Sequence, residues 1–187
     1  QNDVPVLGMA VEYTPVSGAV AEDALSTTLG DAGDASEGLL DAGQTLASDE
    51  ANGLAGSLNT LIAVSDGADE PTSVVFGLIG TATASLPTLY SQGEELAYSV
   101  VGNTLTATAH GGTVFTLAVD ADGSWSFDLD DQLDHVDTDS DTTTDLVTAG
   151  GSVSAIDFSA LVTVTVTDAD GDSQTMNGLD AGAFTIA

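Results

Sequence analysis

The sequence contains no lysine and no arginine. It has 30 aspartate and glutamate residues among 187, so its formal net charge is −30. Without basic side chains nothing can pair with phosphate groups, which excludes nucleic acid as a partner. The same absence excludes a P-loop lysine, a Schiff-base lysine and an arginine clamp for anions.

Cysteine is also absent, and the apolar runs are short. A disulfide framework, a thiolate nucleophile and a zinc–thiolate site are therefore excluded. Since no apolar stretch is long enough to cross a bilayer, membrane insertion is not expected. The sequence does not open with a basic-then-apolar secretory leader. Hydrophobic residues still make up 42% of the chain, so we expect a packed core despite the charge.

Thirty carboxylates without basic partners must be kept apart or neutralised. Two unit charges about 4 Å apart repel each other by roughly 4 kcal/mol at an effective dielectric of 20. A folded domain is stable by only about 5–15 kcal/mol in total. The acids are therefore either spread over a solvated, salt-adapted surface or bridged by divalent cations. The first alternative accounts for the total charge but not for the clustering of aspartates.

Residues 60–187 have the pattern of β structure. Apolar and polar residues alternate in short segments separated by Gly, Asp and Asn, which predicts strands joined by tight turns. In "LVTVTVT", Val162, Val164 and Val166 are predicted to face inward. The predicted strands are 72–79, 95–101, 104–109, 113–119, 124–129, 161–167 and 182–187. This pattern predicts an all-β fold, an antiparallel β-sandwich of the immunoglobulin-like kind.

Residues 1–60 are less regular. We expect a strand in "VLGMAVEYTPV" and short helical turns around residues 36–47. The length of the chain suits one domain, so residues 1–187 are predicted to form a single domain with an irregular, partly helical N-terminal part.

Two turns share the quartet Asp-Ala-Asp-Gly. In "TDADGDSQT", the aspartates are Asp168, Asp170 and Asp172; in "VDADGSWSF", Ser124 stands where the third aspartate would be. Calcium takes six to eight oxygen ligands, many of them from carboxylates, and alternate aspartates with a glycine supply several from one loop. Aspartate also suits solvated turns for local reasons. We predict a calcium site at 168–172 and a plain hairpin turn at 120–123.

Weaker clusters of acids are either solvated loops or further calcium sites. Asp3, near the start of the sequence, could share an ion with a neighbouring domain. The other candidate ligands are Asp66 and Asp69 in "VSDGADEP", and Asp137, Asp139 and Asp141 in "LDHVDTDSDTTTD".

The two histidines, His110 and His135, raise the question of an enzyme. The sequence has neither a G-x-S-x-G nucleophile elbow nor an H-E-x-x-H zinc motif. No pair of carboxylates stands out as the acid and base of a glycosidase. We therefore expect structural histidines and no catalysis, with a glycan-active enzyme as the remote alternative.

Several segments occur in an order that resembles a known family. They are "TLYSQGEELAYSVVGNTLTATA", "TVFTLAVDADGSWSFDL", "QLDH", "VTVTVTDADGDSQT" and "FTIA", within about residues 60–187. Together they resemble the repeat domain, of the T1SS-143 type, of giant type I-secreted RTX adhesins. The opening "DVP" is similar to the Asp-Asp-x-Pro junction between such repeats, whereas residues 1–60 are longer and less regular than the usual repeat.

The resemblance implies a calcium-bound β-sandwich, secreted to the bacterial cell surface and folded outside the cell. Its implied partners are neighbouring domains of the same adhesin and an extracellular peptide or protein ligand on another cell. The longer N-terminal part favours a peptide-binding module in cell adhesion and biofilm formation. The alternative is a structural extender of the same adhesin class that binds no ligand.

Overall fold

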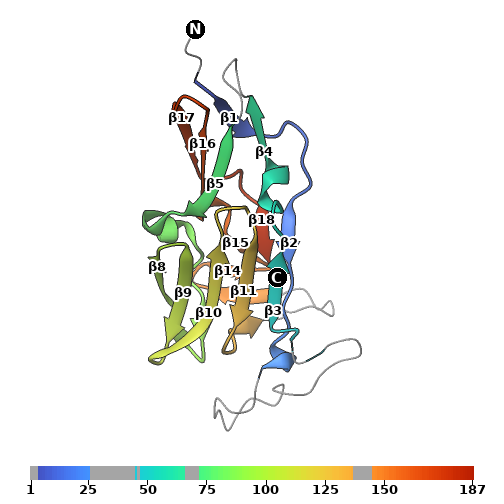
Figure 1. The fold of residues 1–187 in the computed structure, drawn as a ribbon. Coiled ribbons are helices and arrows are strands. Elements are labelled where there is room, and N and C mark those ends of the chain that lie inside the picture. The colour runs from blue at the N-terminus through green and yellow to red at the C-terminus, as the bar shows by residue number, and fades with distance from the viewer. Residues whose placement is uncertain (1–3, 26–44, 46, 66–71, 137–144) are drawn as a thin grey trace.

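The computed structural model describes residues 4–25, 45, 47–65, 72–136 and 145–187 (Figure 1). In this part of the chain nearly all regular structure is β-strand, and almost every strand pair is antiparallel. The predicted all-β, antiparallel fold is therefore confirmed. The described strands form six small sheets, the largest of five strands.

The five-stranded sheet is built from four segments predicted as strands and one from the N-terminal third. Its strands, in spatial order, are β3 (Glu50–Gly53), β11 (Trp125–Leu129), β10 (Gly112–Val119), β9 (Thr104–Ala109) and β8 (Ala97–Val101). Figure 1 shows this sheet occupying one end of an elongated molecule.

Two further sheets lie at the other end of the molecule (Figure 1). One has the order β17 (Ser173–Asn177), β16 (Val162–Thr167), β5 (Ser73–Leu78), and the other pairs β1 (Val6–Met9) with β4 (Ile62–Ser65). The backbone N–H of Leu7 donates to the side-chain oxygen of Gln174 at 2.7 Å, which ties β1 to β17.

The remaining strands are short. One sheet has the order β15 (Ile156–Asp157), β18 (Phe184–Ile186), β2 (Val16–Gly18), and another has β12 (His135–Val136), β13 (Asp145–Thr148), β14 (Gly151–Val153). A two-stranded sheet joins β6 (Tyr90–Ser91) to β7 (Glu94–Glu95). The β2–β18 pair is parallel.

Short 3₁₀ turns connect these strands, as is usual for such turns. They are η1 (Glu22–Ala24), η3 (Leu58–Leu61), η4 (Gly80–Ser85) and η5 (Ser159–Leu161). Among the described residues, no helix is long or apolar enough to cross a lipid bilayer.

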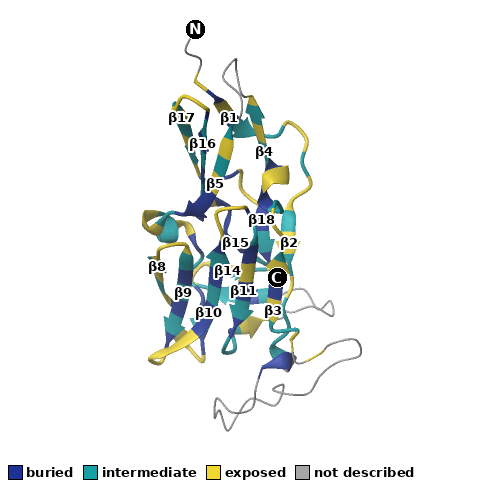
Figure 2. Ribbon diagram, in the orientation of Figure 1, coloured by how far each residue is buried: buried dark blue, intermediate teal, exposed yellow. Residues whose placement is uncertain are grey.

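The alternation of apolar and polar residues in the sequence matches the burial of side chains in strand β16 (Figure 2). In β16, Val162, Val164 and Val166 are fully buried, while the threonines between them are partly exposed. Successive side chains of a strand point to opposite faces, so a strict period of two places one set in the core. The inward-facing prediction for this strand is confirmed.

Aromatic rings fill the centre of the core. Phe158 is fully buried, and its ring centroid lies 6.2 Å from Phe115, 6.0 Å from Phe127 and 6.1 Å from Phe184. These partners come from three different strands, so the contacts join two of the sheets. Burying each such side chain stabilises the fold by about 1.5–3 kcal/mol.

The N-terminal segment differs in detail from the expectation. The strand predicted in "VLGMAVEYTPV" is instead the two short strands β1 and β2, which belong to different sheets. The helical turns predicted around residues 36–47 fall almost wholly outside the described residues.

Candidate metal centre

The turn at residues 168–172 joins β16 to β17. The two strands pair up to Thr167 and Ser173, and Thr167 also pairs with Ser73 of β5. Figure 1 shows this hairpin at the end of the molecule away from the five-stranded sheet. The backbone closes because the N–H of Asp168 donates to the carbonyl of Asp172 at 3.0 Å, and Gly171 takes a φ of 101°, which favours glycine.

Asp168 organises the turn. Its Oδ1 accepts hydrogen bonds from the backbone N–H groups of Gly171, at 3.0 Å, and Asp172, at 2.8 Å. The residue is only 6% exposed, and its Oδ2 is buried and receives no hydrogen bond from the residues that the structure describes. A buried acceptor without a donor costs about 1–3 kcal/mol. The Asp168 Oδ2 atom therefore lacks a partner. Only a cation or a hydrogen-bond donor could satisfy it.

The three aspartates of the turn converge. One carboxylate oxygen each from Asp168, Asp170 and Asp172 lies within 4.8 Å of the others, and in the described part of the chain this is the group that can hold a metal ion. Asp168 is buried, Asp172 is partly exposed and Asp170 is exposed. The group is therefore anchored on the protein and open to solvent on one side.

The electrostatics of the turn favour a cation. The pKa of Asp170 is raised above its ordinary value, first because its carboxyl hydrogen-bonds to the Asp168 side chain. Desolvation and repulsion from Asp168 and Asp172 add to this effect. Crowding of three carboxylates raises the free energy of the ionised turn, and a bound cation would offset that repulsion.

The turn at 120–124 is an internal comparison. The N–H of Asp120 donates to the carbonyl of Ser124 at 2.9 Å, the same closure as in the other turn. Here the Ser124 hydroxyl donates to Asp122 Oδ1 at 2.6 Å, with Asp120 Oδ2 at 3.3 Å as a second acceptor. These bonds lower the pKa of Asp122, so its carboxylate is stable as an anion. In this turn the Ser124 hydroxyl donates to the neighbouring carboxylates. An ionised aspartate at the equivalent position, Asp172, has no hydrogen to donate.

The donor set at 168–172 suits a hard cation. Three carboxylates and no histidine or cysteine make up the group. Oxygen ligands are those that calcium and magnesium prefer, whereas zinc and copper favour nitrogen and sulfur. The orphaned Asp168 Oδ2 and the two neighbouring carboxylates would be the first ligands, and water or another oxygen donor would complete the shell.

The other predicted ligands cannot be placed. Asp3, Asp66, Asp69, Asp137, Asp139 and Asp141 all lie outside the described residues. Of the predicted ligands, Asp168, Asp170 and Asp172 belong to the described residues, and the structure brings these three carboxylates together.

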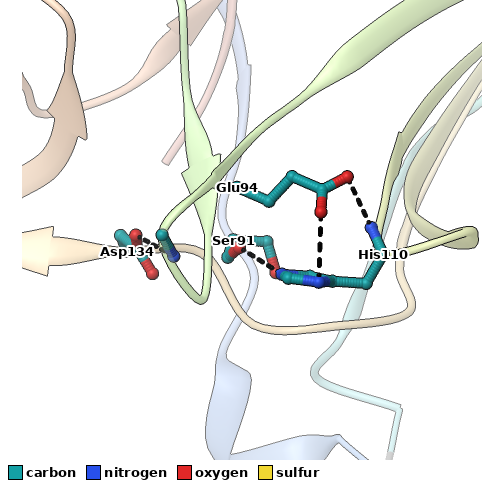
Figure 3. A network of polar contacts seen from close by, with 5 residues as sticks. Ser91, Glu94, His110 and Asp134 are labelled. Atoms are coloured by element: carbon teal, nitrogen blue, oxygen red, sulfur yellow. Dashed lines mark hydrogen bonds and ion pairs between the residues drawn. The ribbon is translucent and has the colours of Figure 1, made fainter.

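Both histidines pair with glutamates. His110 Nδ1 lies 3.2 Å from Glu94 Oε2 and its Nε2 lies 3.1 Å from the Ser91 carbonyl oxygen, while its backbone N–H donates to Glu94 Oε1 at 3.0 Å (Figure 3). His135 Nδ1 lies 3.7 Å from Glu22 Oε1. The His110 contacts join the β9–β10 turn to the β6–β7 hairpin.

A second gathering of acids was not predicted from the sequence. Burial raises the pKa of Asp130, with further contributions from Asp128, Asp49 and Asp131. Burial, and then repulsion from Asp49, raises the pKa of Asp128. The run "DLDD" at 128–131 was a visible signal, but Asp49 joins it only through the pairing of β3 with β11.

Fold and site together define an acidic, all-β protein with one candidate centre for a divalent cation among its described residues. The chain belongs to the family described as "Domain of unknown function (DUF5801)", whose model matches residues 27–180. No curated protein and no solved structure matches the chain in the corresponding comparisons.

Proposed function

We propose that the chain is a calcium-stabilised, ligand-binding module of a large secreted bacterial surface adhesin, most simply a module that binds peptides. The observation that supports it best is the buried, unpartnered Asp168 Oδ2 beside two further carboxylates, in a chain without a single lysine or arginine. The resemblance of residues 60–187 to the repeats of type I-secreted RTX adhesins supplies the cellular setting.

Calcium would act here as a folding ligand. An ion that binds only the native state at about a hundred times its dissociation constant adds roughly 2.7 kcal/mol to the free energy of unfolding. Extracellular calcium sites with dissociation constants of about 10⁻⁴–10⁻³ M suffice in a calcium-rich medium. Inside a cell, where calcium is scarce, the same acids oppose folding, which suits a chain exported before it folds.

A ligand-binding role is supported by a hollow of about 460 Å³ beside the β9–β10 turn of the five-stranded sheet, lined in part by His110, Asp130 and Asp131. A structural extender of the same adhesin class remains the alternative, since it would need the ion but no hollow. The two differ in whether the free surface captures a ligand.

The test is a calcium titration of the wild-type chain, followed by circular dichroism and melting temperature. We expect a saturable rise in melting temperature with calcium that sodium at equal ionic strength does not reproduce. If sodium gives the whole rise, screening of the surface charge is sufficient and the calcium site fails.

Ligand binding is tested separately. A library of peptides and glycans is screened against the calcium-saturated protein and against protein treated with a chelator. Calcium-dependent capture of a peptide supports the module as a binder. A screen in which the calcium response is present but nothing binds favours the extender.

A further inference from the structure

Two hairpin turns and the segment after β11 line a hollow on the surface of the protein. It measures about 460 Å³ and is lined by Gln92, Ala109, His110, Gly112, Thr113, Asp130 and Asp131. Gln92 and His110 have φ values of 49° and 51°, and each is followed by a glycine with positive φ. Positive φ at both central residues is the geometry of a tight type I′ hairpin turn.

The histidine side of the hollow is held in place (Figure 3). Glu94 and the Ser91 carbonyl hold the His110 ring on both nitrogens, and Asp134 Oδ2 accepts the Gly93 N–H at 2.9 Å. The position of this wall is therefore set by hydrogen bonds from three separate segments. A hollow with fixed walls can bind a ligand without first ordering its own side chains.

A group of acids lies at and beside the hollow, and two of them, Asp130 and Asp131, line it. Asp128 and Asp130 flank the buried Leu129, so both carboxyls point away from the core. Asp130 is partly buried and is repelled by Asp128, Asp49 and Asp131. Asp49 Oδ1 is itself buried and accepts no hydrogen bond within the described part of the chain. No lysine or arginine exists anywhere in the 187 residues to neutralise these groups.

Asp130 and Asp131 line an open hollow, whereas the carboxylates at 168–172 converge on a point. In the described residues, the three carboxylate oxygens close enough to share one metal ion are those of Asp168, Asp170 and Asp172. The volume of the hollow is that of an organic group rather than of a single ion. The charge and the shape therefore favour an organic cation over a second metal.

We propose that this hollow binds a lysine or arginine side chain of an extended partner peptide, with Asp130 and Asp131 as its counter-charges. In naming the class of ligand, this inference rests on the proposed ligand-binding function. A smaller hollow of about 280 Å³, lined in part by Glu50 and Asp128, lies on the outer face of the same strands. Residues two apart in an extended chain are about 6–7 Å apart, so a second basic residue at that spacing suits the Asp128–Asp130 pair.

The probe is a fluorescent peptide with the sequence Gly-Lys-Gly-Lys-Gly, blocked at both ends, and its Gln-for-Lys analogue is the uncharged control. Binding is measured by anisotropy with calcium-saturated protein at physiological salt, because low salt exaggerates attraction to a surface of high charge. We expect Asp130→Asn to weaken binding of the lysine peptide about tenfold, and Asp130→Asn/Asp131→Asn to weaken it further. Asp180→Asn removes one charge from an exposed residue outside both hollows and should leave binding within about twofold of wild type.

Two measurements locate the site. The chain has only two histidines, so imidazole proton NMR gives one set of signals for each, assigned with His135→Gln. The peptide should shift the signals of His110, which lines the hollow, and leave those of His135 in place. Asp168→Asn, assayed at a temperature at which circular dichroism shows it to be folded, should bind the peptide as wild type does, because calcium acts on binding only by stabilising the fold and the metal centre does not line this hollow.

The outcomes separate this inference from the proposed function. Equal loss of binding in Asp130→Asn and Asp180→Asn, shifts at both histidines or at neither, or displacement of the peptide by excess calcium would each overturn the cation site. If the library captures only neutral or acidic peptides, the module still binds ligands and this inference alone fails. If no peptide binds at all while calcium still stabilises the fold, both the site and the ligand-binding role fail and the extender is left.

Discussion

Replacing Asp168 by asparagine is expected to leave the calcium-free protein almost unchanged in stability and to abolish most of its stabilisation by calcium. Asparagine keeps the acceptor that receives the Gly171 and Asp172 N–H groups. The amide Nδ2 replaces the unpartnered Oδ2 and puts N–H donors beside the carboxylates of Asp170 and Asp172, which converge with that of Asp168 to within 4.8 Å and can accept from it. The substitution removes one negative ligand from the centre without removing the scaffold of the turn.

The magnitude follows from these contacts. Two hydrogen bonds to a charged acceptor become bonds to a neutral one, which costs about 1 kcal/mol each. Relief of one buried, unsatisfied acceptor returns about 1–3 kcal/mol. The free energy of unfolding without calcium should therefore change by less than about 1 kcal/mol. With calcium at about a hundred times its dissociation constant, the variant should lack most of the roughly 2.7 kcal/mol that wild type gains, which corresponds to about 5–11 °C in melting temperature.

The assay is thermal unfolding followed by circular dichroism, in chelator and in saturating calcium. The matched control is Asp120→Asn, the equivalent substitution in the turn that Ser124 completes. This control should keep the whole calcium response, because its turn hydrogen-bonds internally. The reasoning is refuted if Asp168→Asn keeps the response of wild type, or if both variants lose it equally.

Three further predictions concern the turn, the second group of acids and the core. Asp172→Ser gives this turn the composition of its counterpart, so thermal melts should show little calcium response; an undiminished response would contradict the comparison of the two turns. The pKa values of Asp128 and Asp130 are raised by burial and neighbouring acids, so the folded state holds protons more tightly and the free energy of unfolding should fall as pH rises above about 3.9. Urea titrations across pH should show this fall and a shallower one in Asp130→Asn; an equal slope in both proteins would exclude Asp130 as a source. Phe158→Ala should cost about 3–5 kcal/mol in urea unfolding and equally so with and without calcium; a loss below about 1 kcal/mol would mean that this ring does not anchor the core.

The strands were predictable where one face is buried and the period is strict. The segment 161–167 is β16 to within one residue, because its valines and threonines alternate without interruption. Strand β10 likewise follows its predicted segment closely, at Gly112–Val119. The cluster of aspartates at 168–172 was equally predictable, because three aspartates within five residues have to lie near one another.

Features that depend on distant segments were not predictable. The β2–β18 pair joins residues from opposite ends of the sequence, and neither strand carries a signal for its partner. The hollow beside His110 needs two hairpin turns and the end of β11 to meet. The acids of residues 128–131 occur as an ordinary run in the sequence, and only the fold brings Asp49 near them and removes part of the solvent around Asp130.

Strand β18 has a consequence for the order of events during folding. Its three residues are the middle strand of a sheet, hydrogen-bonded to β15 on one side and to β2 on the other, and Phe184 reaches both Trp125 and Phe158. Residues from both ends of this sequence must therefore come together before that sheet can close. Contacts of such long range are slow to form, so we expect this sheet to close later than the hairpins of the five-stranded sheet.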